Sequence, residues 1–265
     1  MIVTGASSGI GEAAARAFGH KDAKVVLVAR RVEKMRNLAH EINSSGAETL
    51  VVQADLSKLV DIQALVTRTL EKFERIDVLV NNAGFGRMDW LEKLDPVKDI
   101  QEQIDMNVLS VIQTTRQVLP VMLKQRSGSI VNMCSISGLI ATPTYSIYAA
   151  SKHAVHGFSE ALRREVKPLG IDVSIIYPGG VLDTEFAQNA TFKRTTNTST
   201  PKFMQLTTEQ VGDAIIKLVR NPRRMLIIPW QWRVTVFLNK LFPGLVDHTT
   251  ISQFTIPERK EELNS

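Results

Sequence analysis

Cysteine is nearly absent from this 265-residue chain: Cys134 is the only one, so no internal disulfide can form. A chain without disulfides is typical of a reducing compartment, and we expect a cytoplasmic location. Long apolar runs are missing as well, since none approaches the ~18 residues of a membrane span. The N-terminus has no basic region followed by an apolar stretch, so we expect no signal peptide there.

Charge of one sign is not concentrated anywhere in the chain. The net charge of +5 arises from 32 Lys and Arg against 27 Asp and Glu, which are interleaved. No aromatic–basic RNA-binding motif occurs, so we expect a solvated surface and no nucleic-acid partner. A hydrophobic content of 44% fits a globular protein with a sizeable core.

Short β-branched runs alternate with longer amphipathic stretches along the chain. This alternation predicts an α/β protein with a doubly wound parallel sheet of about seven strands and helices on both faces. No Pro/Gly/Ser-rich linker interrupts the pattern, so residues 1–265 are expected to form one domain. The expected strands are 2–4, 24–29, 48–53, 77–81, 129–134, 172–177 and 225–228, and the expected helices are 9–19, 32–44, 59–74, 97–124, 147–168 and 208–219.

The first expected strand runs directly into a glycine-rich loop, TGASSGIG at residues 4–11. Glycines in such a loop permit a tight turn, a close approach to a pyrophosphate, and packing of the next helix with its N-terminus toward the phosphates. The strand–loop–helix context indicates dinucleotide binding. The expected contacts are Gly5, Ser7, Ser8, Gly9, Ile10 and Gly11.

A carboxylate is missing from the end of the second expected strand, where NAD-binding proteins use one to bind the ribose. Arg30 and Arg31 stand there instead, and a guanidinium suits a phosphate. We therefore predict NADP(H) in preference to NAD(H). The alternative is that both arginines are merely solvated.

Two further strand ends carry candidate cofactor contacts. Asp55 follows the third strand, where its carboxylate can accept a hydrogen bond from an adenine amino group. The fourth strand ends in NNAG, residues 81–84, whose small side chains let the chain pass close to a ribose. Asn81 or Asn82 is equally suited to bracing the sheet. The expected contacts here are Asp55, Leu56, Asn82, Ala83 and Gly84.

Tyr148 and Lys152 lie one helical turn apart in the run YAASK. A phenol normally ionises near pH ~10, and a neighbouring ammonium lowers that pKa. The pair therefore suits proton transfer at neutral pH.

These motifs, in this order, together resemble the short-chain dehydrogenase/reductase family of the short single-domain type. The resemblance covers the chain to about Thr184 and implies a catalytic tetrad of Asn107, Ser135, Tyr148 and Lys152. It implies that Tyr148 exchanges a proton with a carbonyl or alcohol while the nicotinamide exchanges a hydride. Ser135 would bind the substrate oxygen, Lys152 the nicotinamide ribose, and Asn107 a relay water.

Two departures from the family pattern stand out. Few residues precede the first strand, which predicts a truncated or misassigned start. The run PGGVLDT at 178–184 has one residue more than the family's P-G-x-V-x-T. The resemblance still implies cofactor contacts at this end of the sixth strand, and it implies no metal. These expected contacts are Pro178, Gly179, Val181 and Thr184.

The rest of the chain suggests the kind of substrate. We expect residues 185–206 to form a substrate lid loop, and its apolar side chains favour a hydrophobic ketone or aldehyde: Phe186, Phe192, Phe203 and Met204. Residues 229–242 predict an apolar helix, with a stripe of Trp230, Val234, Phe237, Leu238 and Leu241. We favour packing of this stripe against pocket, core or a second subunit over contact with a membrane surface. Residues 257–265 are expected to be a flexible tail.

The sequence thus predicts an NADP(H)-dependent oxidoreductase with a small-molecule carbonyl or alcohol substrate. The alternative function is a non-catalytic dinucleotide-binding sensor or scaffold, but a non-catalytic relative would be expected to lose Tyr148 or Lys152. A homodimer or homotetramer is implied by the resemblance.

Overall fold

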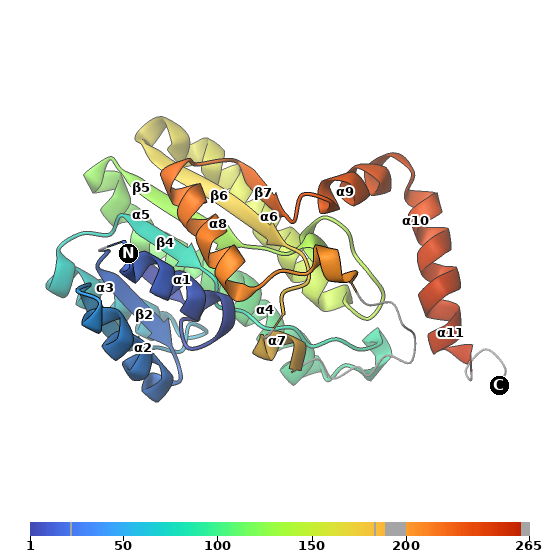
Figure 1. Cartoon of the computed structure of the whole chain (residues 1–265), viewed down its shortest axis with the longest axis horizontal. Helices are drawn as coiled ribbons and strands as arrows, with labels where there is room; N and C mark the ends of the chain where they lie inside the picture. Colours follow the sequence, from blue (N-terminus) through green and yellow to red (C-terminus); the bar gives the residue numbers. More distant parts are fainter. Residues whose placement is uncertain (22, 183, 189–199, 261–265) are drawn as a thin grey trace.

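A computed structural model describes residues 1–21, 23–182, 184–188 and 200–260 of the chain. Within these residues seven strands form one parallel sheet, in the order β3-β2-β1-β4-β5-β6-β7 (Figure 1). The predicted doubly wound α/β fold is confirmed. The strands are β1 (Ile2–Thr4), β2 (Val25–Ala29), β3 (Thr49–Gln53), β4 (Val78–Asn81), β5 (Gly128–Met133), β6 (Ile171–Pro178) and β7 (Met225–Ile228).

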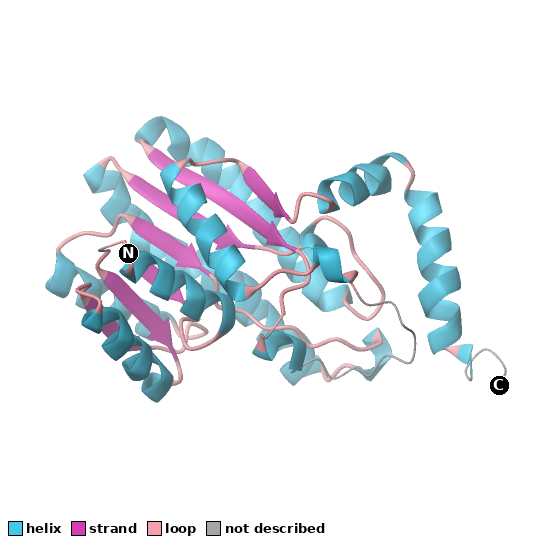
Figure 2. Ribbon diagram, in the orientation of Figure 1, coloured by secondary structure: helices cyan, strands magenta, loops and turns pink. Residues whose placement is uncertain are grey.

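Helices connect the strands and continue beyond the last one (Figure 2). The α-helices are α1 (Gly9–Gly19), α2 (Val32–Ser44), α3 (Leu59–Phe73), α4 (Glu102–Ile104), α5 (Ser110–Gln125), α6 (Ser146–Val166), α7 (Glu185–Gln188), α8 (Thr208–Arg220), α9 (Trp232–Leu241), α10 (Pro243–Thr250) and α11 (Ile256–Glu258). The 3₁₀ and π segments are η1 (Leu91–Lys93), η2 (Pro96–Gln101), η3 (Asp105–Leu109), η4 (Ile136–Gly138), η5 (Lys167–Leu169), η6 (Lys202–Met204) and η7 (Ile251–Thr255).

Side chains of each strand alternate between two buried faces of the sheet. Val3 and Leu27 pack with α1, α2 and α8, whereas Ile2 and Val26 pack with α3, α5 and α6. In Figure 1, α1 and α8 cross in front of the strands, and α5 and α6 lie behind them. Burial on both faces explains why the strands appear in the sequence as continuous apolar runs.

The candidate site residues follow the carboxyl ends of four parallel strands. The glycine loop follows β1, residues 82–84 follow β4, Ser135 lies just beyond β5, and Gly179 follows β6. The strand order reverses between β1 and β4, and ligands of such sheets bind in the crevice at that point. The topology therefore gathers the predicted cofactor and catalytic residues at the carboxyl ends of the strands.

The helical stretch predicted at 97–124 is continuous but not uniform. It begins with the π-helical segment η2, passes through α4, and contains a second π-helical segment, η3, before α5. Single π turns inside α-helices frequently mark functional sites. Here η3 contains Asn107, one of the predicted catalytic residues.

The chain ends in an arm of helices, α9 to α11, that extends away from the sheet in Figure 1. Its far end returns to the body, where the Phe254 ring lies 6.1 Å from the Trp90 ring. Trp232 and Val236 of α9 pack on a small core cluster around Tyr177. The five residues of the predicted stripe, by contrast, are exposed, so they do not pack into the core or pocket of their own chain.

Candidate active site

The glycine loop after β1 is folded in a way that excludes side chains. Gly5 and Gly9 have positive φ angles of 68° and 58°, a region that favours glycine. A Cβ at Gly11 would lie 2.2 Å from the Gly5 carbonyl oxygen. The N-cap Ser8 makes no side-chain cap to α1, so the helix N-terminus keeps unsatisfied N–H groups. Such a cradle fits a pyrophosphate.

An anionic side chain occupies the rim of this cradle. The Glu185 carboxylate lies 2.7 Å from Arg31 Nη1 and 2.8 Å from Lys34 Nζ, and it accepts a hydrogen bond from Ser8 Oγ. Lys34 and Arg31 lower the pKa of Glu185 to about 2. Arg31 also donates to Ser7 Oγ at 3.0 Å. The carboxylate stands in for an anionic group of a ligand, and its contacts show that this rim can bind one.

The two arginines after β2 have different surroundings. Arg31 lies over the glycine loop, whereas Arg30 lines a cavity of about 470 Å³ with Asp55 and Lys58. Burial acts to raise the pKa of Asp55, but hydrogen bonds from Ser57 outweigh it and the pKa is lowered. Asp55 therefore presents an ionised carboxylate to this cavity. The side chain of the predicted contact Leu56 is buried in the core.

The two asparagines at the end of β4 brace this part of the sheet. Asn81 Nδ2 donates to Thr115 Oγ1 and to Asn132 Oδ1, which ties three elements together. Asn82 Nδ2 donates to the Thr4 carbonyl at 3.0 Å, and the backbone N–H groups of Asn82 and Ala83 donate to Thr4 Oγ1. Of the two roles left open by the sequence, the structure shows the bracing one.

Tyr148 and Lys152 of α6 and Ser135 just beyond β5 lie close together. Lys152 Nζ lies 5.6 Å from the centroid of the Tyr148 ring and donates to the Met133 carbonyl at 3.1 Å. Both side chains are buried, and Ser135 lies near enough to Tyr148 to act against a rise in its pKa. Burial raises the pKa of Tyr148, against the effect of Ser135, and burial lowers the pKa of Lys152. The lowered tyrosine pKa expected from the lysine is therefore wrong for the protein by itself, because burial dominates.

Asn107 lies fully buried beside this group. Its Oδ1 accepts from the Phe85 N–H at 3.0 Å, and its Nδ2 donates to the Phe85 carbonyl and to Ser151 Oγ. A Cβ at Gly84 would lie 2.9 Å from Asn107 Oδ1 and 3.7 Å from Lys152 Nζ. Gly84 thus allows the amide and the ammonium to approach the same point, while Oδ1 keeps one acceptor position for a water.

The segment after β6 returns to the glycine loop. Val181 pairs with Leu206 in an isolated parallel bridge. Thr184 is buried, and its Cγ2 lies 3.6 Å from the point where a Cβ of Gly9 would stand. The extra residue before this threonine therefore does not keep it from the phosphate cradle. Gly179 lies under Trp232, whose Nε1 would be 2.3 Å from a Cβ there.

One apolar side chain of the 185–206 segment lies against the Tyr148 ring. The Phe186 ring centroid lies 5.1 Å from that of Tyr148. Met204 is buried, Phe203 is exposed, and Phe192 lies outside the described residues. Lys34 and Glu185 were not among the predicted site residues. A salt bridge between residues 151 positions apart leaves no local pattern in a sequence.

Cys134 is adjacent to Ser135 in the sequence, but its thiol is buried in the core. Its Sγ donates to the Lys152 carbonyl at 3.2 Å, and burial raises the pKa of the thiol to about 11. A buried thiol held protonated is not a nucleophile. Cys134 therefore belongs to the core, as the alternation of β5 predicts.

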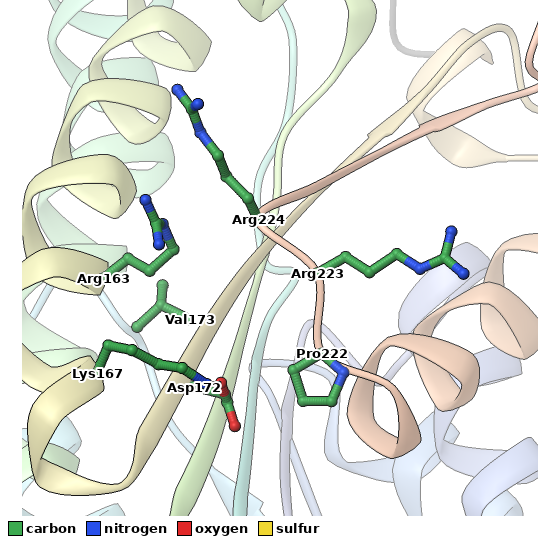
Figure 3. Close-up of a pocket in the computed structure, with 7 residues that line it drawn as sticks. All are labelled: Arg163, Lys167, Asp172, Val173, Pro222, Arg223 and Arg224. Carbon is green, nitrogen blue, oxygen red and sulfur yellow. Dashed lines mark hydrogen bonds and ion pairs between the residues drawn. The ribbon is translucent and has the colours of Figure 1, made fainter.

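A separate hollow lies at the opposite end of the strands, where β6 and β7 begin. This cavity of about 170 Å³ is lined by Arg163, Lys167, Asp172 and Arg223 among others (Figure 3). Lys167 pairs with Asp172 at 2.5 Å, and the Arg223 side chain points away from Arg163 in Figure 3. Its cations do not converge on one point, so we assign it no ligand.

Comparisons with known proteins agree with this geometry. The family model described as short chain dehydrogenase matches residues 1–195. A 3-oxoacyl-[acyl-carrier-protein] reductase of Synechocystis is 38% identical over 71% of this chain and 76% of its own length.

Two solved structures share the fold and hold nicotinamide dinucleotides. An alcohol dehydrogenase of Thermococcus sibiricus complexed with 5-hydroxy-NADP has a TM-score of 0.76 and 28% identity, covering 86% of this chain and 94% of its own. A short chain dehydrogenase/reductase of Burkholderia phymatum in complex with NAD has a TM-score of 0.82 and 27% identity, covering 92% and 93%. With its phosphate cradle and its buried Tyr148–Lys152 pair, this chain belongs to the short-chain dehydrogenase/reductase family and is an NAD(P)-dependent oxidoreductase.

Proposed function

We propose that the chain is an NADP(H)-dependent oxidoreductase that acts on a hydrophobic ketone or aldehyde, or on the corresponding alcohol. The observation that carries the proposal is the group of buried Tyr148 and Lys152 with half-buried Ser135, with the Phe186 ring 5.1 Å from the ring of the tyrosine. A proton donor beside an apolar ring suits a carbonyl carried on an apolar body.

Each side chain of this group has a distinct task. Bound nicotinamide dinucleotide supplies or accepts the hydride at the substrate carbon. Tyr148 donates its hydroxyl proton to the carbonyl oxygen, or takes a proton from the alcohol in the reverse direction. Ser135 holds the same oxygen. Lys152, on the same face of α6, binds ribose hydroxyls and replaces the proton that Tyr148 has lost.

The pKa of Tyr148 favours the donor role. Burial raises this pKa, so the protein alone keeps the phenol protonated, which is the form that carbonyl reduction requires. Oxidation of an alcohol requires the phenolate. The charge of Lys152 and the positive charge of oxidised nicotinamide act in that direction.

The preference for NADP(H) is supported by the cations around Glu185. Arg31 and Lys34 bind a carboxylate at the rim of the glycine loop, and a phosphate at that position would carry more charge and more acceptor oxygens. We propose that the 2′-phosphate of NADP(H) takes the place of the Glu185 carboxylate. Among the related structures, one holds an NADP derivative and another holds NAD.

Steady-state kinetics would test the proposal. NADPH oxidation would be followed with a panel of ketones and aldehydes of increasing apolar size, using the wild type and Tyr148→Phe. We expect activity that rises with apolar size, higher efficiency with NADPH than with NADH, and loss of ~10²-fold or more in Tyr148→Phe. Equal rates for wild type and Tyr148→Phe would overturn the enzymatic role of the tyrosine.

We also propose a cytoplasmic location and a homo-oligomer formed by helix packing. The single buried cysteine supports a reducing compartment. Leu109, just before α5, and Leu123, in the last turn of α5, are exposed apolar side chains. They support helix packing between subunits. Light scattering on the purified protein would measure the oligomeric state, and a monomer at micromolar concentration would contradict it.

A further inference from the structure

The helices after β7 present an apolar surface that no other part of the described chain covers. We call this surface the arm face and define it by the residues listed at the end of this paragraph. No residue of α9 or α10 is buried. Of the eighteen large apolar side chains that are exposed in the described chain, seven lie within residues 230–245. They are Trp230, Val234, Phe237, Leu238, Leu241, Phe242 and Leu245.

The arm face is not the side of α9 that holds the helix to the protein. Trp232 and Val236 pack on the core cluster around Tyr177. Phe237 and Leu241 lie on another side of the helix and are 61% and 53% exposed. Because successive residues are about 100° apart on a helix, the two sets face different directions. Anchoring of α9 therefore leaves the arm face outward.

The two charges that border the arm face on α9 are both positive, and Asp247 is the one acidic residue of α9 and α10. Arg233 and Lys240 of α9 are exposed and stand, by helical spacing, between the arm face and the side that packs on the core.

This charge pattern decides between two occupants. A second copy related by a two-fold axis would bring the same surface patch onto itself, so four positive charges, Arg233 and Lys240 of each copy, would face only the two Asp247 carboxylates. A lipid surface with anionic headgroups complements the basic border, while the aromatic and aliphatic side chains enter the boundary with the acyl chains. Exposed Trp230 is of the type enriched at that boundary.

None of the helices in the described part of the chain has the length and apolar character to cross a bilayer. We infer that the arm face binds the surface of an anionic lipid bilayer, with α9 and α10 lying along the interface rather than spanning it. The inference does not depend on the identity of the dinucleotide or of the carbonyl substrate. Its test therefore needs no enzyme activity.

Co-sedimentation of the full chain with vesicles would test the inference. Vesicles of phosphatidylcholine alone would be compared with vesicles that also contain phosphatidylglycerol. We expect binding to the anionic vesicles that weakens with salt. Arg233→Gln with Lys240→Gln should weaken it on the order of thirtyfold, since each basic residue contributes about a factor of five.

The apolar part of the face would be tested by Phe237→Ala with Leu241→Ala. The matched control is Val60→Ala with Leu169→Ala, whose side chains are 65% and 51% exposed on other elements. We expect the first pair to reduce vesicle binding by roughly tenfold or more and the control pair to leave it unchanged. Both double variants should keep the wild-type unfolding temperature, because none of the four side chains is buried.

A spectroscopic measurement would locate the contact. Trp230 emission should shift to the blue on addition of anionic vesicles, and most of the shift should disappear in Trp230→Phe. Absence of pelleting with anionic vesicles would overturn the inference. So would a dimer that dissociates in Phe237→Ala with Leu241→Ala while vesicle binding is absent, because the arm face would then be a contact between copies.

Discussion

In the proposed reaction, Tyr148 must be protonated to reduce a carbonyl and ionised to oxidise an alcohol. Burial raises its pKa above the ordinary value of about 10, so the phenol stays protonated at neutral pH in the protein alone. Reduced nicotinamide is uncharged and does not oppose this effect, whereas the oxidised ring carries a positive charge that favours the phenolate. The two directions of the reaction should therefore depend on pH in different ways.

We predict that kcat/KM for carbonyl reduction, with saturating NADPH, stays level from pH 6 to about 10. For alcohol oxidation with saturating NADP⁺, kcat/KM should rise with pH through this range, because the phenolate form becomes more populated. The two pH dependences differ because the pKa of Tyr148 is raised. The protonated phenol that reduction needs persists over this range, whereas the phenolate that oxidation needs is scarce. Reduction that declines from about pH 7 upward would contradict a raised pKa.

Gly11 is the glycine with the least space for a side chain in the phosphate cradle. A Cβ there would lie 2.2 Å from the Gly5 carbonyl oxygen and 2.5 Å from Asn82 Nδ2, and neither backbone nor the braced amide can yield. We predict that Gly11→Ala costs about 1–3 kcal/mol of unfolding free energy and removes dinucleotide binding. Urea denaturation and dinucleotide titration would measure the two effects.

Gly157 of α6 provides the matched control. A Cβ at Gly157 would meet nothing within 4 Å, and the residue lies in the middle of a helix. Gly157→Ala should therefore stabilise the protein by up to about 1 kcal/mol. A loss of stability in both alanine variants would show that steric exclusion at Gly11 is not the cause.

At the scale of elements, α8 begins with a complete capping box. Thr207 Oγ1 accepts from the Gln210 N–H, and the Gln210 side chain accepts from the Thr207 N–H. The neighbouring Leu206 pairs with Val181, so this helix start is fixed beside the predicted nicotinamide contact. Loss of the cap should therefore lower the unfolding free energy of the protein.

We predict that Thr207→Ala lowers the unfolding free energy by about 1 kcal/mol. Thr208→Ala is the control, because its hydroxyl contacts only the exposed Glu209 side chain among the described residues. Its effect should stay within about 0.5 kcal/mol. Thermal and urea unfolding would compare the two, and equal losses would contradict a specific role of the cap.

The elements also show what the sequence can and cannot predict. The strands were predicted nearly to the residue, because burial on both faces makes each a continuous apolar run. The π-helical segment that contains Asn107 could not be predicted, because a π-helix differs from an α-helix only in the spacing of its hydrogen bonds. On α9, helical periodicity predicts one apolar stripe but gives no means of telling which apolar side chains meet the core. Trp232 and Val236 do so because they face Tyr177 across the end of β6.

The catalytic part of the site was predictable for a related reason. Tyr148 and Lys152 are close in sequence, and Ser135 is fixed at the end of β5, so local spacing carries their arrangement. The tie from Glu185 to Arg31 joins residues 154 positions apart, and no spacing rule reports it. The pKa of Tyr148 was mispredicted in direction for a different reason, since burial in three dimensions outweighs a charge one turn away.

At the scale of the whole molecule, dinucleotide binding should stabilise the native state. At about 100 times Kd, a ligand that binds only the folded protein adds ~2.7 kcal/mol, or roughly 5–10 °C in Tm for a chain of this size. At one fixed concentration, we predict a larger rise with NADPH than with NADH. Thermal unfolding of the full chain would measure both rises.

Arg31→Gln should bring the NADPH rise down to that of NADH. Arg36→Gln, in the helix α2 that Arg31 precedes and paired only with the exposed Glu33 among the described residues, should leave the difference intact. Equal rises with the two dinucleotides in the wild type would contradict the proposed NADP(H) preference. The rise in unfolding temperature can be measured without any carbonyl substrate.

The contacts of Glu185 and Phe186 also have a consequence for protein engineering. One peptide bond joins the carboxylate held by Arg31 and Lys34 to the ring that lies 5.1 Å from Tyr148. In the function proposed above, coenzyme choice and substrate fit therefore both depend on one short stretch of backbone. A variant library built to exchange NADPH for NADH at Arg31 will also change the range of carbonyl compounds accepted, and the two traits will have to be selected together.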